Sequence, residues 1–243
     1  MSERPVTLVT GGSTGIGAAI CRRMIEAGHD VVSLAQRRPE WSHPSLHAID
    51  VDLTDRRATE QAAATVASKF AIATVIHNAG AIRASLLAEV SQKDLHDLTQ
   101  LHLGAAILIV QAALPRMREQ NFGRIVLISS RAALGLPTRT VYSATKAGLI
   151  GMARTWALEL APAGITVNVV SPGPIQDTAM FRDVIPAGSD REAALAKTIP
   201  VGRLGLSDDV ARAVLFFADP QNSFVTGQVL YVCGGSSLAS ISI

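Results

Sequence analysis

The stretch Val6-Thr-Leu-Val-Thr-Gly-Gly-Ser-Thr-Gly-Ile-Gly17 decides the fold, and it runs directly into Ala18-Ala-Ile-Cys-Arg-Arg-Met-Ile-Glu-Ala-Gly28. The apolar run before the glycines is typical of a buried parallel strand, and the spacing after them indicates an amphipathic helix. Gly11, Gly15 and Gly17 allow a tight turn that brings backbone N–H groups close to a diphosphate at the helix N-terminus. The segment predicts a dinucleotide-binding unit, although a glycine-rich turn by itself could be purely structural.

Six more strand-like runs follow this unit, and helical patterns separate most of them. With the first run they span Val6–Val9, Asp30–Leu34, Leu46–Ile49, Ala73–His77, Arg124–Ile128, Thr166–Val170 and Gln228–Val232. Strands that alternate with helices predict an α/β fold, a Rossmann-type doubly wound parallel sheet of about seven strands with helices on both faces. Because no repeat or linker divides the chain, we expect a single domain over residues 1–243.

Composition narrows the classes of function. The chain has 243 residues, of which 48% are hydrophobic and 17% charged, and its net charge is +2. Lys and Arg are scattered, so we expect no nucleic-acid or membrane partner. The N-terminus enters a strand by Val6, and the apolar run Ala105–Val110 is too short to span a bilayer. Cys21 and Cys233 are far apart and suggest neither a disulfide framework nor a metal site. A cytoplasmic location is expected.

The pair Tyr142 and Lys146 carries the chemistry. A helix places residues i and i+4 on one face, so an ammonium group would stand beside a phenol. A phenol, with a pKa of about 10, exchanges protons poorly at neutral pH, and a neighbouring cation moves that pKa toward the working range. The pair is therefore suited to protonating or deprotonating an alcohol oxygen. Chance alone also places Tyr and Lys at this spacing on many helices.

Together these motifs resemble the short-chain dehydrogenase/reductase family over nearly the whole chain. The landmarks are Thr10–Gly17, Asp52-Leu53, Asn78-Ala79-Gly80, Ser129-Ser130, Tyr142-x-x-x-Lys146 and Pro172-Gly-Pro-Ile175. The resemblance implies an NAD(P)-binding domain with a substrate flap at about residues 176–206. It also implies cofactor contacts from Gly11, Ser13, Thr14, Gly15, Ile16, Gly17, Asp52, Leu53, Asn78, Ala79, Gly80, Tyr142, Lys146, Pro172, Gly173, Ile175 and Thr178.

The family also uses a serine hydroxyl to hold the substrate carbonyl beside the tyrosine. Its usual spacing to the tyrosine selects Ser129, whereas alignment through the strand Gly123–Ser130 selects Ser130. Strand register fixes where a side chain points, and loops absorb deletions easily. We therefore favour Ser130 and expect Ser129 to serve local hydrogen bonding.

The choice of cofactor is read at the end of the second strand. Family members that select NAD commonly carry Asp at the position of Ala35, where this chain has no acid. Arg37, with Arg38 or Ser13, could bind a 2′-phosphate through charge-assisted hydrogen bonds. Gln36 stands where NADP enzymes usually have Arg, and both arginines could be solvated loop charges. NADP(H) is favoured, and NAD(H) stays open.

The family's fourth active-site residue is an Asn, and this chain has His102 there, in Leu101-His102-Leu103. A lone His between leucines is more often a packed residue than a catalytic one. Because His can donate and accept, it could support a water leading to Lys146. Its protonation would then add a second cation near Lys146 and reduce activity below about pH 6.

These expectations define an NADP(H)-preferring oxidoreductase that interconverts a secondary alcohol and a ketone through Ser130, Tyr142, Lys146 and His102. The alternatives are an NAD-dependent alcohol dehydrogenase and a dinucleotide-binding sensor or scaffold without turnover. Apolar helices at about 91–120 and 140–163 suggest a homotetramer, as the family forms, with a dimer as second choice. The sequence leaves the small-molecule substrate open.

Overall fold

The computed structural model describes residues 4–238, and these form one seven-stranded parallel sheet in the order β3-β2-β1-β4-β5-β6-β7. Its strands are β1 Val6–Thr10, β2 Asp30–Ala35, β3 Leu46–Asp50, β4 Ile72–His77, β5 Gly123–Ile128, β6 Ile165–Pro172 and β7 Val229–Val232. The neighbouring strands all pair in parallel. The predicted Rossmann-type fold is therefore confirmed, and each predicted strand lies within two residues of its observed bounds.

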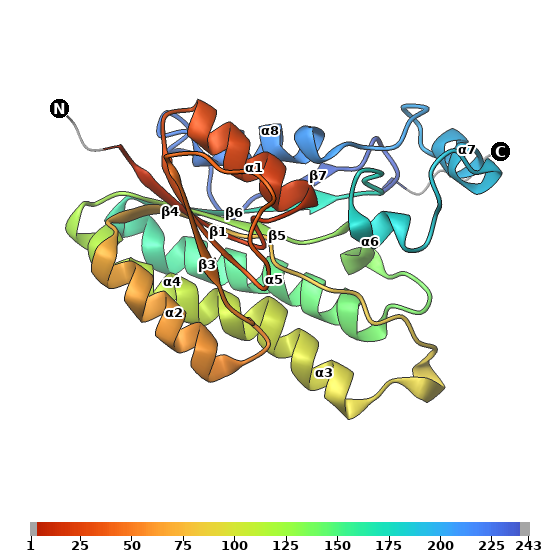
Figure 1. Cartoon of the computed structure of the whole chain (residues 1–243), viewed down its shortest axis with the longest axis horizontal. Helices are drawn as coiled ribbons and strands as arrows, with labels where there is room; N and C mark the ends of the chain where they lie inside the picture. The colour runs from red at the N-terminus through yellow and green to blue at the C-terminus, as the bar shows by residue number, and fades with distance from the viewer. Residues whose placement is uncertain (1–3, 239–243) are drawn as a thin grey trace.

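Helices cover both faces of the sheet, as Figure 1 shows. The α-helices of the described chain are α1 Gly15–Glu26, α2 Arg56–Lys69, α3 Gln92–Thr99, α4 Ala105–Glu119, α5 Thr140–Leu160, α6 Ala179–Arg182, α7 Asp190–Thr198 and α8 Ser207–Ala218, of which α6 and α7 lie beyond the end of the sheet. Two apolar cores result. One lies between the sheet and α2, α4 and α5, and the other between the sheet and α1 with α8. The two cores lie on opposite faces of the sheet. Ligands of such folds bind at the loops that follow the carboxyl ends of the strands.

A π-helical turn, η2 at Gln100–Gly104, joins α3 to α4 into a continuous helix. By length and composition, the whole helix Gln92–Glu119 could cross a membrane. The buried core helix of a soluble protein can be equally long and apolar. The expectation that the apolar run is too short to span considered only part of this helix and is corrected here. Because Ile109, Ala113 and Met117 are buried against the sheet, we interpret the helix as a core element.

The segment expected to be a substrate flap, 176–206, contains α6 and α7 and is tied down at both ends. The backbone N–H of Gln176 donates to the carbonyl of Gly205 at 2.9 Å. The Asp177 carboxylate accepts from the N–H and the hydroxyl of Ser207, each at 2.9 Å, at the start of α8. Between these anchors the segment runs out beyond the end of the sheet (Figure 1).

Candidate active site

The glycine-rich turn between β1 and α1 is built for close approach of backbone to a ligand. Gly11 has φ +66°, and a Cβ on Gly17 would stand 1.9 Å from the Gly11 carbonyl oxygen, so no side chain fits there. Thr14 is the N-cap of α1 and its side chain caps no N–H group. Ser13, Thr14 and Gly15 line a surface cavity, while Ile16 packs against the core below. Open N–H groups and a cradle without side chains fit the diphosphate of a dinucleotide.

Asn78-Ala79-Gly80, after β4, supports this turn from the side. The hydroxyl of Thr10 accepts from the N–H groups of Asn78 and Ala79, both at 2.9 Å. The Asn78 side chain donates to the carbonyls of Thr10 and Gly11 at 3.2 and 3.1 Å. Asn78 therefore holds the shape of the turn, and the expected cofactor-binding segments lie against each other.

Tyr142 and Lys146 stand on α5, and both are buried, with exposures of 7% and 3%. The Lys146 Nζ lies 5.7 Å from the centroid of the Tyr142 ring and donates to the Ile128 carbonyl, at the end of β5, at 2.8 Å. A Cβ on Gly80 would lie 3.3 Å from the Lys146 Nζ, so the Asn-Ala-Gly segment passes directly over the ammonium group. A phenol, a cation and the glycine-rich turn thus meet at the carboxyl end of the sheet.

The two serines after β5 face different neighbours. The Ser129 hydroxyl is buried and donates to the Lys146 carbonyl at 2.7 Å. The Ser130 hydroxyl accepts from the Ala132 N–H at 3.1 Å and lies next to the Tyr142 phenol, whose negative form it stabilises. Alternation of side chains along extended backbone explains the difference. Of the two, Ser130 is the one that the structure brings to the phenol.

Burial dominates the protonation of this pair. It raises the pKa of Tyr142 above its ordinary value, against smaller lowering influences from Ser130 and Arg139. Burial also lowers the pKa of Lys146 to about 7. The expectation that Lys146 brings the phenol pKa down is therefore corrected, because loss of solvation raises that pKa and the groups that oppose the rise are Ser130 and Arg139. The phenol keeps its proton at neutral pH, which suits a proton donor to a carbonyl oxygen.

His102 lies in the π-helical turn and is fully buried, with its ring 5.7 Å from that of Tyr142, edge to face. Its Nε2 accepts from the Ala81 N–H at 3.2 Å, so its Nδ1 carries the proton and donates to the Thr145 hydroxyl at 2.8 Å. Both ring nitrogens have protein partners, so the ring has no free nitrogen for the expected relay water. Burial, Lys146 and His77 hold the pKa of His102 far below its usual range. The expected protonation near pH 6 is also corrected.

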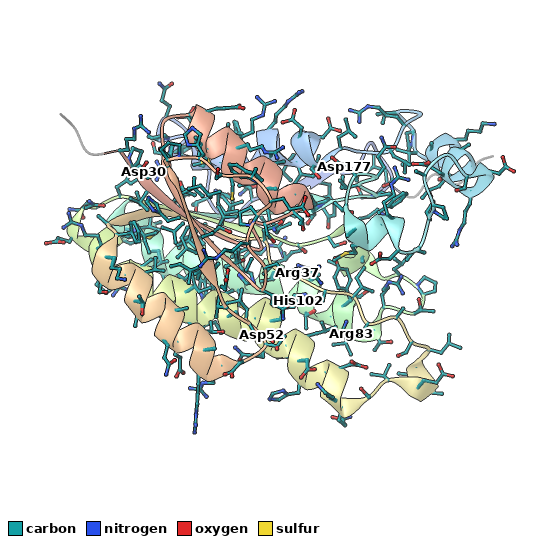
Figure 2. All side chains as sticks on the ribbon, in the orientation of Figure 1. Asp30, Arg37, Asp52, Arg83, His102 and Asp177 are labelled. Atoms are coloured by element: carbon teal, nitrogen blue, oxygen red, sulfur yellow. The ribbon has the colours of Figure 1, made fainter. Side chains whose placement is uncertain are left out.

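The residues expected to bind the adenosine part of the cofactor follow β2 and β3, at the carboxyl end of the sheet. Figure 2 shows Arg37, Asp52 and His102 there, away from Asp30 at the start of β2. Leu53 is buried beside the exposed Asp52, whose carboxylate accepts from the N–H and hydroxyl of Thr54 at 2.9 and 2.7 Å. Burial raises the pKa of Asp52, but hydrogen bonds from Thr54 and Gln36 outweigh it and leave the pKa lowered.

Of the expected contacts after β6, Thr178 lies against the glycine-rich turn. β6 ends at Pro172. A Cβ on Gly173 would stand 2.8 Å from Cys233, so the backbone at Gly173 packs closely against Cys233. Ile175 is buried, and the Thr178 methyl group lies 3.2 Å from where a Gly15 Cβ would be. The structure therefore brings Thr178, one of the expected cofactor contacts, to Gly15.

Sequence reasoning missed three residues around this site. Thr145 lies between Tyr142 and Lys146, where no motif marks it, and it links His102 to the carbonyls of α5. His77 ends β4, and its buried Nδ1 lies 3.1 Å from the Thr10 hydroxyl. Burial and the charge of Lys146 lower the pKa of His77 to about 3. Arg139 was missed because it lies in a loop with no motif. Within residues 4–238, no group of three His, Cys, Asp or Glu is placed to hold a metal.

Known proteins support the assignment that this geometry suggests. The family model described as Enoyl-(Acyl carrier protein) reductase matches residues 11–237. The BbsD subunit of (2S)-[(R)-hydroxy(phenyl)methyl]succinyl-CoA dehydrogenase from Thauera aromatica is 40% identical, covering 97% of this chain and 98% of its own. The 3-oxoacyl-[acyl-carrier-protein] reductase of Thermotoga maritima is 34% identical, covering 96% and 98%. The solved structure of ElxO with bound NADP superimposes with a TM-score of 0.87 at 27% identity, covering 96% and 98%.

The family model spans most of the chain, and the relatives match from end to end. The same landmarks that predicted a dinucleotide site and a Tyr–Lys pair now lie together at one edge of the sheet. The chain therefore belongs to the short-chain dehydrogenase/reductase family and is an NAD(P)-dependent oxidoreductase that acts on CH–OH or carbonyl groups.

Proposed function

We propose that this enzyme interconverts a secondary alcohol and a ketone with a preference for NADP(H). The observation that carries the proposal is the meeting of Ser130, Tyr142 and buried Lys146 beside the glycine-rich turn. Steady-state assays with a panel of ketones and alcohols, each with NADPH and NADH or their oxidised forms, test it. Absence of turnover across the panel with every cofactor form would contradict the proposal and favour a dinucleotide-binding sensor or scaffold.

In the reductive direction, Tyr142 donates its phenolic proton to the carbonyl oxygen of the substrate, and Ser130 orients that oxygen. The nicotinamide, when bound, supplies the hydride. The phenolate that remains would be costly in a buried site, and the ammonium of Lys146 stabilises it by charge. Because the Lys146 Nζ already donates to Ile128, its position is fixed before the proton moves. The reverse direction uses the same groups with the proton travelling back.

NADP(H) preference rests on the charges beyond β2. Ala35 ends β2, where an acid would repel a 2′-phosphate. Arg38 forms an ion pair with Asp50 at 3.1 Å, but Arg37 is exposed and has no ion-pair partner within residues 4–238. We assign Arg37 to the phosphate, with Ser13 as a neighbour on the glycine-rich turn. The NADP bound to the similar ElxO supports this choice. NAD dependence in the oxidative direction is the second candidate.

An acyl thioester is the first substrate class to assay. The names of the Thauera and Thermotoga relatives both describe an oxygen function on an acyl thioester. The rim of the site carries exposed Leu86, Leu87, Leu134 and Leu136, which suit an apolar acyl portion.

The two cysteines are compatible with the expected cytoplasmic location. Cys21 and Cys233 are free thiols, as a reducing cytoplasm would allow.

We also propose a homotetramer that pairs the helix Gln92–Glu119 and α5 with their copies. Ile107 on α4 and Leu158 on α5 point away from the core, with exposures of 38% and 82%. Exposed apolar side chains on neighbouring helices are typical of subunit interfaces. Light scattering at micromolar protein concentration tests this, and a monomer would contradict it.

A further inference from the structure

Arg139 stands at the start of the helix that carries Tyr142. It is the N-cap of α5, three residues before Tyr142, and residues three apart on a helix share a face. Burial raises the pKa of Tyr142 and Ser130 opposes this, and the charge of Arg139 is the next influence that lowers it. The start of α5 therefore brings a positive charge to the neighbourhood of Tyr142, at a residue that no sequence motif marks.

The guanidinium has donors without partners. Its Nη1 donates to the carbonyl and the hydroxyl of Thr138, at 3.3 and 2.7 Å. Its Nε is buried and has no hydrogen-bond partner within residues 4–238, and no carboxylate of that region forms an ion pair with it. Nearby, Arg83 pairs with Asp94 at 3.6 Å. Buried charged donors without partners are costly, so an uncompensated guanidinium in an active site indicates a missing anion.

The backbone beside Arg139 is held in a strained shape. Thr138 has φ +64°, a left-handed conformation that a β-branched residue rarely adopts. The Ser85 N–H donates to the Thr138 carbonyl at 3.1 Å, and the Thr138 hydroxyl accepts from Arg139. Strain of this kind persists where surrounding contacts determine it, often at ligand-binding positions. Here the conformation of Thr138 holds the Arg139 guanidinium in place and joins the loop of Thr138 to the loop of Ser85.

We propose that Arg139 binds a carboxylate that the substrate carries close to its reacting carbon. This inference rests on the proposed alcohol/ketone function and adds a substrate class to it. A planar guanidinium can bind a carboxylate through two parallel hydrogen bonds. Because Arg139 and Tyr142 are one helical turn apart, the anion must belong to the reacting part of the substrate. The distant phosphates of a thioester carrier do not meet this condition.

The side chains around Arg139 indicate what the rest of the substrate looks like. The bridge between Ser85 and Arg139 brings the segments that carry Leu86, Leu87, Leu134 and Leu136 to the same rim. Apolar side chains around a single cation suit a substrate with one carboxylate and an apolar remainder. The predicted class is a keto acid or hydroxy acid of this kind, free or as part of a larger thioester.

Matched pairs of acid and neutral ester test the inference. The probes are 4-oxopentanoate and 4-oxo-4-phenylbutanoate with their methyl esters, assayed with wild type, R139Q and R139K, and with R83Q as the control. We expect wild type to prefer each acid by at least 10-fold in kcat/KM, mainly through KM. R139Q should lose that preference, R139K should keep part of it, and R83Q should match wild type. An ester reduced as well as its acid, or an equal loss in R139Q for both, would overturn the proposal.

A binding measurement separates this proposal from the function on which it rests. Calorimetric titration of NADP-bound enzyme with 4-oxo-4-phenylbutanoate should show at least 10-fold weaker binding by R139Q than by wild type. Equal affinity would overturn the carboxylate site even if no ketone is turned over. Absence of turnover with affinity that depends on Arg139 would instead refute the proposed function alone. Unchanged NADP affinity and circular dichroism of R139Q show that the variant is folded.

Discussion

The Ser129 hydroxyl donates a 2.7 Å hydrogen bond to the backbone carbonyl of Lys146. This contact joins the end of β5 to the middle of α5, so it sets where the helix that carries Tyr142 lies against the sheet. It also occupies the Ser129 proton. The tandem serines are thus separated by direction: Ser129 faces the helix backbone, and Ser130 faces the phenol.

Substitution of each serine tests this division. Ser130→Ala should lower kcat by roughly 10²-fold, since it removes a hydroxyl that orients the substrate oxygen. Ser129→Ala should keep most of the activity but lower the free energy of unfolding by about 1 kcal/mol, the usual contribution of one hydrogen bond. Steady-state kinetics and urea unfolding measure the two effects. If Ser129→Ala loses more turnover than Ser130→Ala, the assignment is reversed.

Tyr142→Phe tests the proton donor. It removes only the hydroxyl, so we expect turnover to fall by at least about 10² while NADP(H) affinity changes little. Fluorescence titration with NADPH provides the binding control. A variant that keeps more than about a tenth of wild-type turnover would show that another group supplies the proton.

Much of this site was predictable because its motifs are local. The glycine-rich turn and the Tyr142–Lys146 spacing each depend on a few consecutive residues, and parallel strands bring such segments to one edge of a sheet. The π-helical turn at Gln100–Gly104 was not predictable, because no residue type marks it and packing decides it.

Tertiary contacts also explain the errors about protonation. The spacing of Tyr142 and Lys146 correctly placed a cation by a phenol, but the effect of burial on both pKa values depends on what covers them. In the same way, His102 was placed correctly and its partners were not, because Ala81 and Thr145 reach it from other segments.

Cofactor preference should respond to the end of β2. Ala35→Asp should shift preference from NADP(H) toward NAD(H) by on the order of 1–3 kcal/mol, because its carboxylate would repel a 2′-phosphate and bind ribose hydroxyls. Arg37→Gln should weaken kcat/KM for NADPH and leave NADH nearly unchanged. Arg38→Gln is the matched control, since Arg38 already pairs with Asp50. A wild-type preference for NAD(H) refutes the assignment.

Lys146→Met should abolish most turnover and yet stabilise the fold at low pH. Burial lowers the pKa of Lys146 to about 7 from 10.5, so the unfolded chain binds this proton more tightly than the folded protein. The wild-type lysine therefore destabilises the fold most below pH 7, and this cost disappears as pH rises toward 10.5. Thermal unfolding should show a higher Tm for Lys146→Met at pH 6, with a gap that narrows by about pH 9.5. A gap that widens with pH would contradict the buried-ammonium interpretation.

His102 is expected to act by position and not by titration. Its ring links the Ala81 N–H to the Thr145 hydroxyl, beneath the Tyr142 ring. His102→Asn offers an amide that can also accept and donate, so it should keep most of the activity. His102→Leu leaves the Ala81 N–H without its acceptor and removes the donor to the Thr145 hydroxyl, so it should cost about 1–3 kcal/mol in unfolding free energy, with roughly 10-fold lower turnover as Tyr142 loses its support.

The pH profile distinguishes this role from a titrating one. Because burial, Lys146 and His77 hold the pKa of His102 far below its usual range, the ring stays neutral throughout the range in which the protein is assayed. Wild type and His102→Asn should therefore show the same acid limb of kcat/KM between about pH 5 and 7, where an ordinary histidine would titrate. An acid limb that is present in wild type and disappears in His102→Asn would show that the imidazole does gain a proton there. That result would show that His102 acts in a proton relay to Lys146 and not only as a packed, hydrogen-bonded ring.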